Sequence, residues 1–368
     1  MLLPNALAAA CVAFIAPTYA DDLTKLSDEF DDPASLSDWH RVYQTEGWGA
    51  DQLESIDIGS TREGRLTLVP RASSWYQDWR GALVYKNVQG DFVATMQVEP
   101  RNLAGDGPPG SLYSLAGIMA RMPRDEMASP DDWNPNRENY LFLSLGMAND
   151  PGAYQFEVET TFNSSSNLSL DSGSPSALLQ IARVGDVFIV LRQLEGEAWE
   201  VHRRYYRSDM PDTVQVGMIA YTDWETAQDM DALQHNQTAS ERGTPDLRAS
   251  VDYFRFSRPW IPPSYQDADF LDPYDVTDGE LVALFGDRMN RTVGDVAPRI
   301  VDLDLVPGSG LRLLVDTDPG FIYELYQSED LENWQIVHEE RAYYETLELQ
   351  LDESRFSEGA LVRVGVRE

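Results

Sequence analysis

Two glutamates of one predicted strand, Glu157 and Glu159, are of a residue type that can carry acid–base chemistry. Residues two apart on a β-strand share one face at about 7 Å, so both carboxylates would point into one cleft. A retaining glycosidase places a nucleophile and an acid about 5–5.5 Å apart, and the pKa of the acid is raised by its partner. Glu138 precedes the neighbouring predicted strand and is a third candidate. The alternative is a charged stripe that faces solvent or a polar ligand contact.

An aromatic cluster precedes two further predicted strands. Trp75, Tyr76 and Trp79 lie beside Asp78 and Arg80. Ligand sites combine apolar and aromatic surface with a few polar groups that fix orientation, and an aromatic face can stack on the C–H face of a pyranose. We therefore expect a sugar-binding platform at this loop, with Asp78 and Arg80 holding sugar hydroxyls. The alternative is that the tryptophans cap the core of a sandwich.

The elements that must position these residues are predicted to be β-strands. Between residues 23 and 257, short segments with apolar residues two apart are broken by Gly, Pro, Asn and Asp, which is typical of an all-β sandwich. Helical periodicity is absent from this range. The predicted strands include Arg65–Val69, Phe92–Val98, Leu115–Arg121, Tyr140–Leu145, Tyr154–Thr161, Leu178–Arg183, Val187–Gln193, Val214–Tyr221 and Val251–Phe256.

Four long loops interrupt this pattern. Loops longer than about 12–15 residues in a compact domain are often functional, although each could be a variable surface insertion. The last of them contains Trp224, Glu225 and His235 and could form a short helix. The predicted loops are Asn102–Ser114, Pro123–Asn136, Asn163–Ser176 and Asp223–Thr244.

The chain divides into four predicted regions. Residues 1–20 are a predicted signal peptide, and residues 21–258 are the large β domain. Residues 259–298 are a predicted linker with one short helix near residues 278–289. Residues 299–368 resume the alternation in six or seven short segments, which favours a small immunoglobulin-like β-sandwich.

The first 20 residues are typical of a secretory signal, because an apolar run is followed by Thr18-Tyr19-Ala20. No later stretch reaches the ~20 apolar residues of a membrane span. We expect a secreted or extracellular protein, with the bacterial periplasm or cell surface as alternatives. Cys11 is the only cysteine and lies in this segment, so the mature chain is expected to have no disulfide and no thiol chemistry.

The net charge is −34, from 62 acidic and 28 basic residues. A field of that sign argues against nucleic acid and anionic membranes as partners. It fits a salty habitat, where screening shortens the repulsion, or the binding of divalent cations. It also disfavours a strongly anionic polysaccharide unless Ca²⁺ bridges the charges or a local basic patch intervenes. The four histidines are far apart in sequence, which makes a zinc centre improbable.

Several segments carry a family resemblance. The opening Ser27-Asp28-Glu29-Phe30-Asp31-Asp32 and the closing VDYFRF, residues 251–256, are similar to the first and last strands of laminarinase-like domains. RGALVYKNVQGDFVATMQV and LLQIARVGDVFIVLRQLEGEAWEVH lie between them. Residues 27–257 thus resemble the concanavalin A-like lectin/glucanase superfamily, as a bacterial secreted member without assigned chemistry.

The resemblance implies a jelly-roll fold and two kinds of site. Hydrolases of the superfamily carry Glu-x-Asp-x-x-Glu on an inner strand, and here Glu157 and Glu159 match two carboxylates while the central Asp and the third are absent. A structural Ca²⁺ often ties the first strand to the last, which implies Glu29 and Asp252 as ligands. Calcium takes six to eight oxygen ligands, so backbone carbonyls would have to complete the shell.

The sequence thus predicts an all-β chain: a concanavalin A-like jelly-roll sandwich followed by a small immunoglobulin-like β-sandwich. We expect it to bind a polysaccharide or oligosaccharide noncatalytically through the aromatic platform, with Tyr140 and Glu157 as additional contacts. The first alternative is a glycan hydrolase or lyase of the same fold that uses Glu157, Glu159 or Glu138. The second is a surface structural or adhesive protein. The sequence leaves the glycan and the oligomeric state open.

Overall fold

The computed structural model describes residues 23–259, 261–286, 298–306, 310–317, 321–331, 333–342, 346–351 and 361–367. The predicted signal peptide, including Cys11, lies outside these residues, as do residues 287–289 of the predicted short helix. The described residues contain no helix long and apolar enough to cross a membrane.

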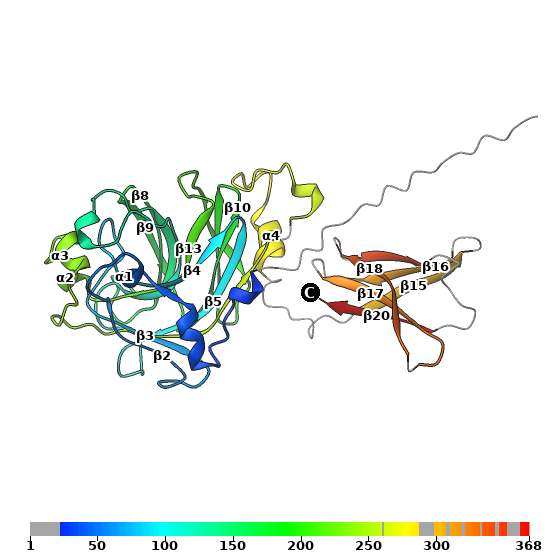
Figure 1. Ribbon diagram of the computed structural model, residues 1–368, viewed down its shortest axis with the longest axis horizontal. Helices are drawn as coiled ribbons and strands as arrows, with labels where there is room; N and C mark the ends of the chain where they lie inside the picture. Colours follow the sequence, from blue (N-terminus) through cyan, green and yellow to red (C-terminus); the bar gives the residue numbers. More distant parts are fainter. Residues whose placement is uncertain are drawn as a thin grey trace, which may run out of the picture.

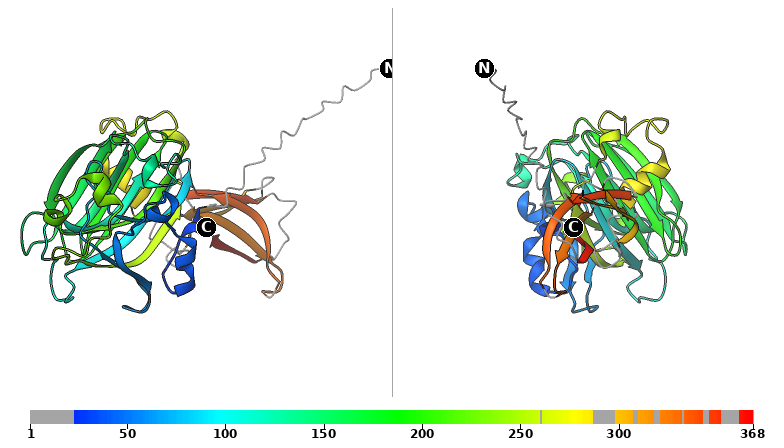
Figure 2. Two further views of the ribbon diagram at one scale, coloured as in Figure 1. Left: turned by 60° about the vertical axis from the view of Figure 1, so that its left-hand side comes forward. Right: turned by 90° about the vertical axis from the view of Figure 1, so that its right-hand side faces the viewer.

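The larger domain consists of two seven-stranded sheets, and all of their strand pairings are antiparallel. The two layers are visible from different directions in Figure 1 and Figure 2. In the front sheet the order is β1 (His40–Arg41), β4 (Ala82–Gln89), β13 (Thr213–Tyr221), β6 (Ser114–Arg121), β7 (Tyr140–Met147), β8 (Gln155–Phe162) and β9 (Ser165–Ser172). In the back sheet it is β12 (Glu200–Tyr206), β11 (Val187–Leu194), β10 (Ala177–Val184), β5 (Phe92–Arg101), β14 (Arg248–Ser257), β3 (Leu66–Pro70) and β2 (Leu53–Ile58).

This arrangement confirms the predicted jelly-roll sandwich of two antiparallel sheets. Strands far apart in sequence become neighbours, because β13 lies between β4 and β6, and β14 lies between β5 and β3. The predicted loop Asn163–Ser176 is wrong in part, since Ser165–Ser172 forms the edge strand β9. The Ser and Asn residues of this stretch obscure the alternation of apolar and polar residues. A strand at the edge of a sheet nevertheless forms, because it needs backbone hydrogen bonds to only one neighbouring strand.

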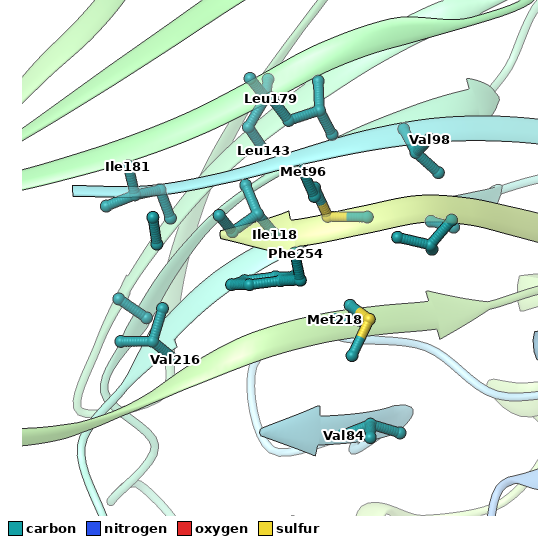
Figure 3. Close-up of a cluster of buried hydrophobic side chains, with 14 of the residues drawn as sticks. Val84, Met96, Val98, Ile118, Leu143, Leu179, Ile181, Val216, Met218 and Phe254 are labelled. Atoms are coloured by element: carbon teal, nitrogen blue, oxygen red, sulfur yellow. The ribbon is translucent and has the colours of Figure 1, made fainter. Parts of the chain in front are cut away.

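The main core fills the space between the two sheets. In β5, Phe92, Ala94, Met96 and Val98 point inward, as the two-residue period of a strand requires. Met96 lies near Ile118 of the front sheet, as Figure 3 shows, and all four side chains belong to the same core cluster as Ile118. Burial of apolar surface stabilises by roughly 25 cal/mol per Å², so this core supplies most of the stability of the domain.

A second apolar layer covers the outer face of the front sheet. It contains side chains from β4, β6, β7 and β13 together with Val42 and Trp75 from covering segments. Three short helices lie in these covers: α1 (Val42–Thr45), α2 (Trp224–Ala227) and α3 (Ala232–Asn236). In Figure 1 they lie toward the left of the larger sandwich. The front sheet is therefore buried on both faces, which explains its nearly continuous apolar strands.

A different segment covers the outer face of the back sheet. Residues 261–286 contain η4 (Pro263–Tyr265), α4 (Asp278–Leu281) and the π-helix η5 (Val282–Gly286). Phe270, Val276 and Phe285 pack there on Ile189 and Leu191. Gln180 of β10 also donates to the Phe285 carbonyl at 3.2 Å. This part of the predicted linker thus packs on the back sheet and is not an extended connection between domains.

The C-terminal residues form the predicted smaller sandwich, with an apolar cluster between two three-stranded antiparallel sheets. One sheet has the order β15 (Arg299–Val306), β16 (Gly310–Asp316) and β19 (Thr346–Leu351). The other has the order β18 (Gln335–Arg341), β17 (Ile322–Ser328) and β20 (Leu361–Arg367). The short 3₁₀ helices elsewhere in the chain are η1 (Thr24–Leu26), η2 (Pro33–Asp38) and η3 (Pro130–Asp132).

The cover formed by residues 261–286 yields a prediction. Phe285 is fully buried, so Phe285→Ala removes a core side chain, and we expect a loss of about 3–5 kcal/mol in the free energy of unfolding. Tyr274→Ala is the control, because Tyr274 is 96% exposed and its loss should leave stability unchanged. Urea denaturation followed by tryptophan fluorescence measures both. Equal stability of the two variants would contradict the packed cover.

Candidate functional site

A pocket of about 250 Å³ opens on the outer side of the front sheet. Its base comes from β8 and β9, and its walls come from the covering segments. Two aromatic rings form one wall, with Tyr76 edge-on to Trp224 at 5.7 Å between ring centroids. The lining residues are Ser74, Trp75, Tyr76, Tyr113, Glu157, Leu168 and Trp224.

Trp224 is held in place by an unusual backbone turn. The preceding Asp223 is buried and has a left-handed conformation, with φ 58°. Its carboxylate accepts hydrogen bonds from the backbone N–H groups of Thr244 at 2.6 Å and Thr226 at 3.3 Å. Tyr113, also of the pocket wall, has φ 52°. Non-glycine residues in this region are strained by about 1–3 kcal/mol, and such strain concentrates at ligand sites.

Glu157 is the ionisable group of the pocket. Its side chain is buried, and its Oε2 accepts a hydrogen bond from the Tyr221 hydroxyl at 2.9 Å. Burial, followed by the charge of Glu159, raises the pKa of Glu157 to about 8, against the opposing effect of the Tyr221 hydrogen bond. Glu157 is therefore neutral at pH 7 and can donate a hydrogen bond or a proton to a bound molecule.

Glu159 lies on the same side of β8 but does not line the pocket. Its Oε1 accepts hydrogen bonds from the Tyr140 hydroxyl at 3.1 Å and from Thr161 Oγ1 at 2.8 Å. Its Oε2 has no hydrogen-bond partner within the described part of the chain. Burial raises the pKa of Glu159 to about 7, although hydrogen bonds from Ser166, Thr161 and Tyr140 oppose the rise.

Glu138 belongs to a buried ionic cluster, which we call the Arg121 cluster. The Arg121 guanidinium donates to both oxygens of Glu138, at 2.9 and 3.1 Å, and also to Glu46 at 2.5 Å. Arg124 adds a hydrogen bond to Glu138 at 2.9 Å. Burial alone would raise the pKa of Glu138, but these arginines outweigh it and lower the pKa. The prediction of Glu138 as a cleft carboxylate is wrong, because both of its oxygens are occupied by arginines.

Of the predicted aromatic platform, Tyr76 lines the pocket, and its binding of sugar stays a prediction. Trp75 also lines the pocket but is 1% exposed, so a ring stacked on sugar is wrong for this residue. Its indole N–H donates to the Ala82 carbonyl at 3.0 Å, and its ring packs edge-on to Tyr140 at 5.4 Å. Tyr140 is fully buried and is no ligand contact either.

Arg80 is also a structural residue, contrary to the prediction that it orients sugar hydroxyls. It is 1% exposed, and its guanidinium lies 5.1 Å from the centroid of the Trp48 ring. Nη2 donates to the carbonyls of Asn236 at 2.8 Å and Ala50 at 3.3 Å. Burial lowers the pKa of Arg80 to about 10, partly offset by Glu46. Arg80 thus clamps two covering segments together.

Asp78 and Trp79 support the pocket from outside it. Asp78 accepts hydrogen bonds from Ser164 Oγ at 2.6 Å and from the Asn136 N–H at 3.1 Å, so it ties loops together. Trp79 donates its indole N–H to the Met230 carbonyl at 3.2 Å and packs edge-on to Trp224 at 5.7 Å. Neither residue lines the pocket, and Trp79 acts through Trp224.

Four lining residues were missed as ligand contacts: Ser74, Tyr113, Leu168 and Trp224. Three of them lie in stretches that the sequence flagged as long loops, and Trp224 was named in one of them. Loop length was therefore the useful indication. The segments that each loop contacts could not be predicted from the local sequence pattern, because they are distant in sequence.

The residues implied for calcium are each paired with an arginine. Glu29 accepts two hydrogen bonds from Arg255, at 2.7 and 2.8 Å, and Asp252 lies 3.3 Å from Arg65. Backbone pairing of Asp28 with Phe254 already ties the N-terminal segment to β14. Among the described residues no group of three or more His, Cys, Asp or Glu is arranged to hold a metal ion. A calcium ion at Glu29 and Asp252 stays a prediction.

The chain matches no protein-family model and no curated protein sequence. Its structure is similar to that of a functionally unknown protein from Saccharomyces cerevisiae, at 15% identity and a TM-score of 0.41, over 61% of this chain and 99% of that chain. It is also similar to lectin I-B4 from Griffonia simplicifolia, at 15% identity and a TM-score of 0.33, over 53% of this chain and 87% of that one.

A GH43 protein from Bacillus licheniformis is similar at 15% identity and a TM-score of 0.40. That match covers 64% of this chain and 39% of the other, so the chain spans well under half of its length. These values are too low to assign an activity. The class that the fold and the pocket define is a two-sheet antiparallel β-sandwich, with a pocket of aromatic residues and one glutamate outside its front sheet.

The buried acid predicts a pH dependence of stability. The folded chain keeps the Glu157 proton up to about pH 8, whereas an unfolded glutamate loses it near pH 4.5. The contribution of protonated Glu157 to the free energy of unfolding is thus fully present below about pH 4.5, and it is lost as the pH rises to about 8. We expect the free energy of unfolding of Glu157→Gln to fall less across this window than that of the wild type, by urea denaturation at a series of pH values.

The control is Glu138→Gln, a second buried glutamate with the opposite pKa direction. Here we expect a destabilisation of about 3–5 kcal/mol at neutral pH, because Arg121 and Arg124 lose their shared counter-charge. A wild-type pH profile that Glu157→Gln does not alter would show that Glu157 is ionised in the folded chain.

Proposed function

We propose that the protein binds carbohydrate noncatalytically in the pocket outside the front sheet. The observation that carries the proposal is the meeting of two aromatic side chains, Tyr76 and Trp224, with the neutral acid Glu157 in one small cavity. Sites for small polar molecules combine apolar walls with a few convergent polar groups in this way.

The groups of the pocket have distinct roles in this proposal. Trp224 and Tyr76 provide surface for the C–H face of a sugar ring. Glu157, held by Tyr221, donates a hydrogen bond to a sugar oxygen. The volume of about 250 Å³ is below that of typical pockets for drug-sized ligands, about 300–1,000 Å³, so we propose a short glycan segment or chain end as the ligand.

The charge of the chain supports a place outside the cell. A net charge of −34 keeps a chain soluble in salt, where the repulsion is screened beyond about 8–10 Å. Together with the signal-like segment at residues 1–20, this favours a secreted or extracellular protein that meets polysaccharide in its surroundings.

Trp224→Ala tests the binding site. We expect it to weaken binding of a soluble oligosaccharide at least tenfold, since loss of an aromatic contact at a binding site costs about 1–3 kcal/mol. Trp133→Ala is the matched control, because Trp133 is also partly exposed but does not line the pocket. Binding is measured by titration calorimetry after a screen of insoluble polysaccharides, and the melting temperature of both variants is recorded. Equal affinity of the two variants would exclude this pocket as the site.

The second candidate function is glycan hydrolysis, which the raised pKa of Glu157 at the pocket base favours. A general acid needs such a pKa near the working pH. The opposing observation is that Glu159 is held by Tyr140 and Thr161 beneath the pocket and is not among its lining residues.

Product release separates the two functions. If the protein is a hydrolase, the wild type releases reducing sugars from the polysaccharide that it binds, and Glu157→Gln reduces the rate at least about 100-fold while binding persists. For the noncatalytic proposal we expect no release by the wild type at any pH between 4 and 9. A chain that neither binds nor cleaves any glycan would favour the adhesive alternative.

A further inference from the structure

A second cavity, of about 320 Å³, lies on the back sheet and is lined by three arginines. Arg101 ends β5, Arg248 begins β14, and Arg62 belongs to the turn between β2 and β3. We call this the arginine cavity. Its lining residues are Thr61, Arg62, Glu99, Arg101, Gly105, Arg248 and Ser250.

The pairing of β5 with β14 places two of these charges directly opposite each other. Arg101 is the register partner of Arg248, and Glu99 is the partner of Ser250. Because the even-numbered residues of β5 point into the core, Glu99 and Arg101 face outward. Like charges directly opposite on neighbouring strands destabilise a sheet. An arginine pair in this position is therefore costly unless an anion joins it.

One carboxylate in the cavity faces three guanidinium groups. Glu99 accepts from Arg101 Nε at 2.6 Å through one oxygen and from Arg62 through the other, so both of its oxygens are occupied. Burial alone would raise the pKa of Glu99, but these two arginines outweigh it and lower the pKa. Arg248 makes no ion pair within the described ranges of the chain.

Two aspartates close in sequence to the lining residues, Asp57 and Asp246, are occupied by other groups. Asp57 accepts from the N–H and the hydroxyl of Thr61, at 2.8 and 2.7 Å. Asp246 accepts from the N–H groups of Leu103 at 2.8 Å and Gly110 at 2.9 Å. Neither aspartate lines the cavity. The arginine cavity thus has an excess of positive charge in a chain whose net charge is −34.

We propose that the arginine cavity binds the anionic substituent, carboxylate or sulfate, of an acidic glycan. A guanidinium offers two parallel N–H donors that match an oxyanion, and Arg248 has this fork free for a ligand. The Ser250 hydroxyl supplies a further donor at the same place, whereas the Thr61 hydroxyl is already used by Asp57. The repulsion from the rest of the chain is screened beyond about 8 Å at physiological salt, so a local contact of this kind can act.

This site is independent of the pocket proposed above. The arginine cavity lies on the outer face of the back sheet, whereas the aromatic pocket lies outside the front sheet, on the other side of the sandwich core. One glycan-binding activity can therefore fail while the other persists. The variant Trp224→Ala separates them, since it removes a wall of the aromatic pocket alone.

The test is titration calorimetry of the full chain with four probes: an oligouronate, a sulfated galactan oligosaccharide of equal length, a neutral oligosaccharide and inorganic sulfate. We expect one of the two anionic oligosaccharides to bind, and Arg248→Ala to weaken it about tenfold, as loss of a charge-assisted hydrogen bond predicts. The oligosaccharide that binds identifies the substituent as carboxylate or sulfate.

Arg242→Ala is the matched control, because this substitution removes the same charge from an exposed residue that lines none of the pockets described. We expect it, and Trp224→Ala, to keep wild-type affinity for the anionic probe. Arg248→Lys keeps the charge but loses the fork, and should recover only part of the affinity. Since Arg248 makes no ion pair, its variants should keep the wild-type melting temperature, which is measured in parallel.

Three results would overturn the proposal. In the first, neither anionic oligosaccharide binds. In the second, Arg248→Ala and Arg242→Ala weaken binding equally, which would mean that the anionic probe is held by general electrostatic attraction and not by the cavity. In the third, inorganic sulfate binds as tightly as the sulfated oligosaccharide, which would make the cavity a site for free anions and not for a glycan.

Discussion

The guanidinium of Arg121 is fully buried between Glu46 and Glu138, and the covering layer of the front sheet depends on this contact. A sheet that is apolar on both faces must be covered on both, and loops can do this only if their polar groups are satisfied. Arg121 joins β6 to the segment around α1 and to the start of β7. An unpaired buried charge would cost several kcal/mol, so these segments are held in one arrangement.

The pocket is a consequence of that cover. Because Trp75, Arg80 and Tyr140 are used to attach the covering segments, the ring surface left for a ligand comes from Tyr76, Tyr113 and Trp224 at the margin. The same cover removes water from Glu157 and Glu159. Their raised pKa values thus follow from the packing of the layer above β8.

The larger domain thereby carries two faces of different chemical character. The outer side of the front sheet has a neutral acid among aromatic rings, and the outer side of the back sheet has three arginines around one carboxylate. Residues 261–286 cover another part of the back sheet and leave the arginine cavity open. An acidic chain with a cationic cavity can select an anionic group locally while it repels polyanions elsewhere.

The sequence by itself determined the sandwich, because alternation with period two specifies strands and the face that each buries. It also determined that Glu157 and Glu159 share a face, and it placed a loop with Trp224 among the long loops. Only the tertiary structure decided which tryptophan is covered, that Glu138 pairs with Arg121, and that Arg101 meets Arg248. These outcomes depend on contacts between segments from about 17 to more than 140 residues apart, and local periodicity holds no information on such pairings.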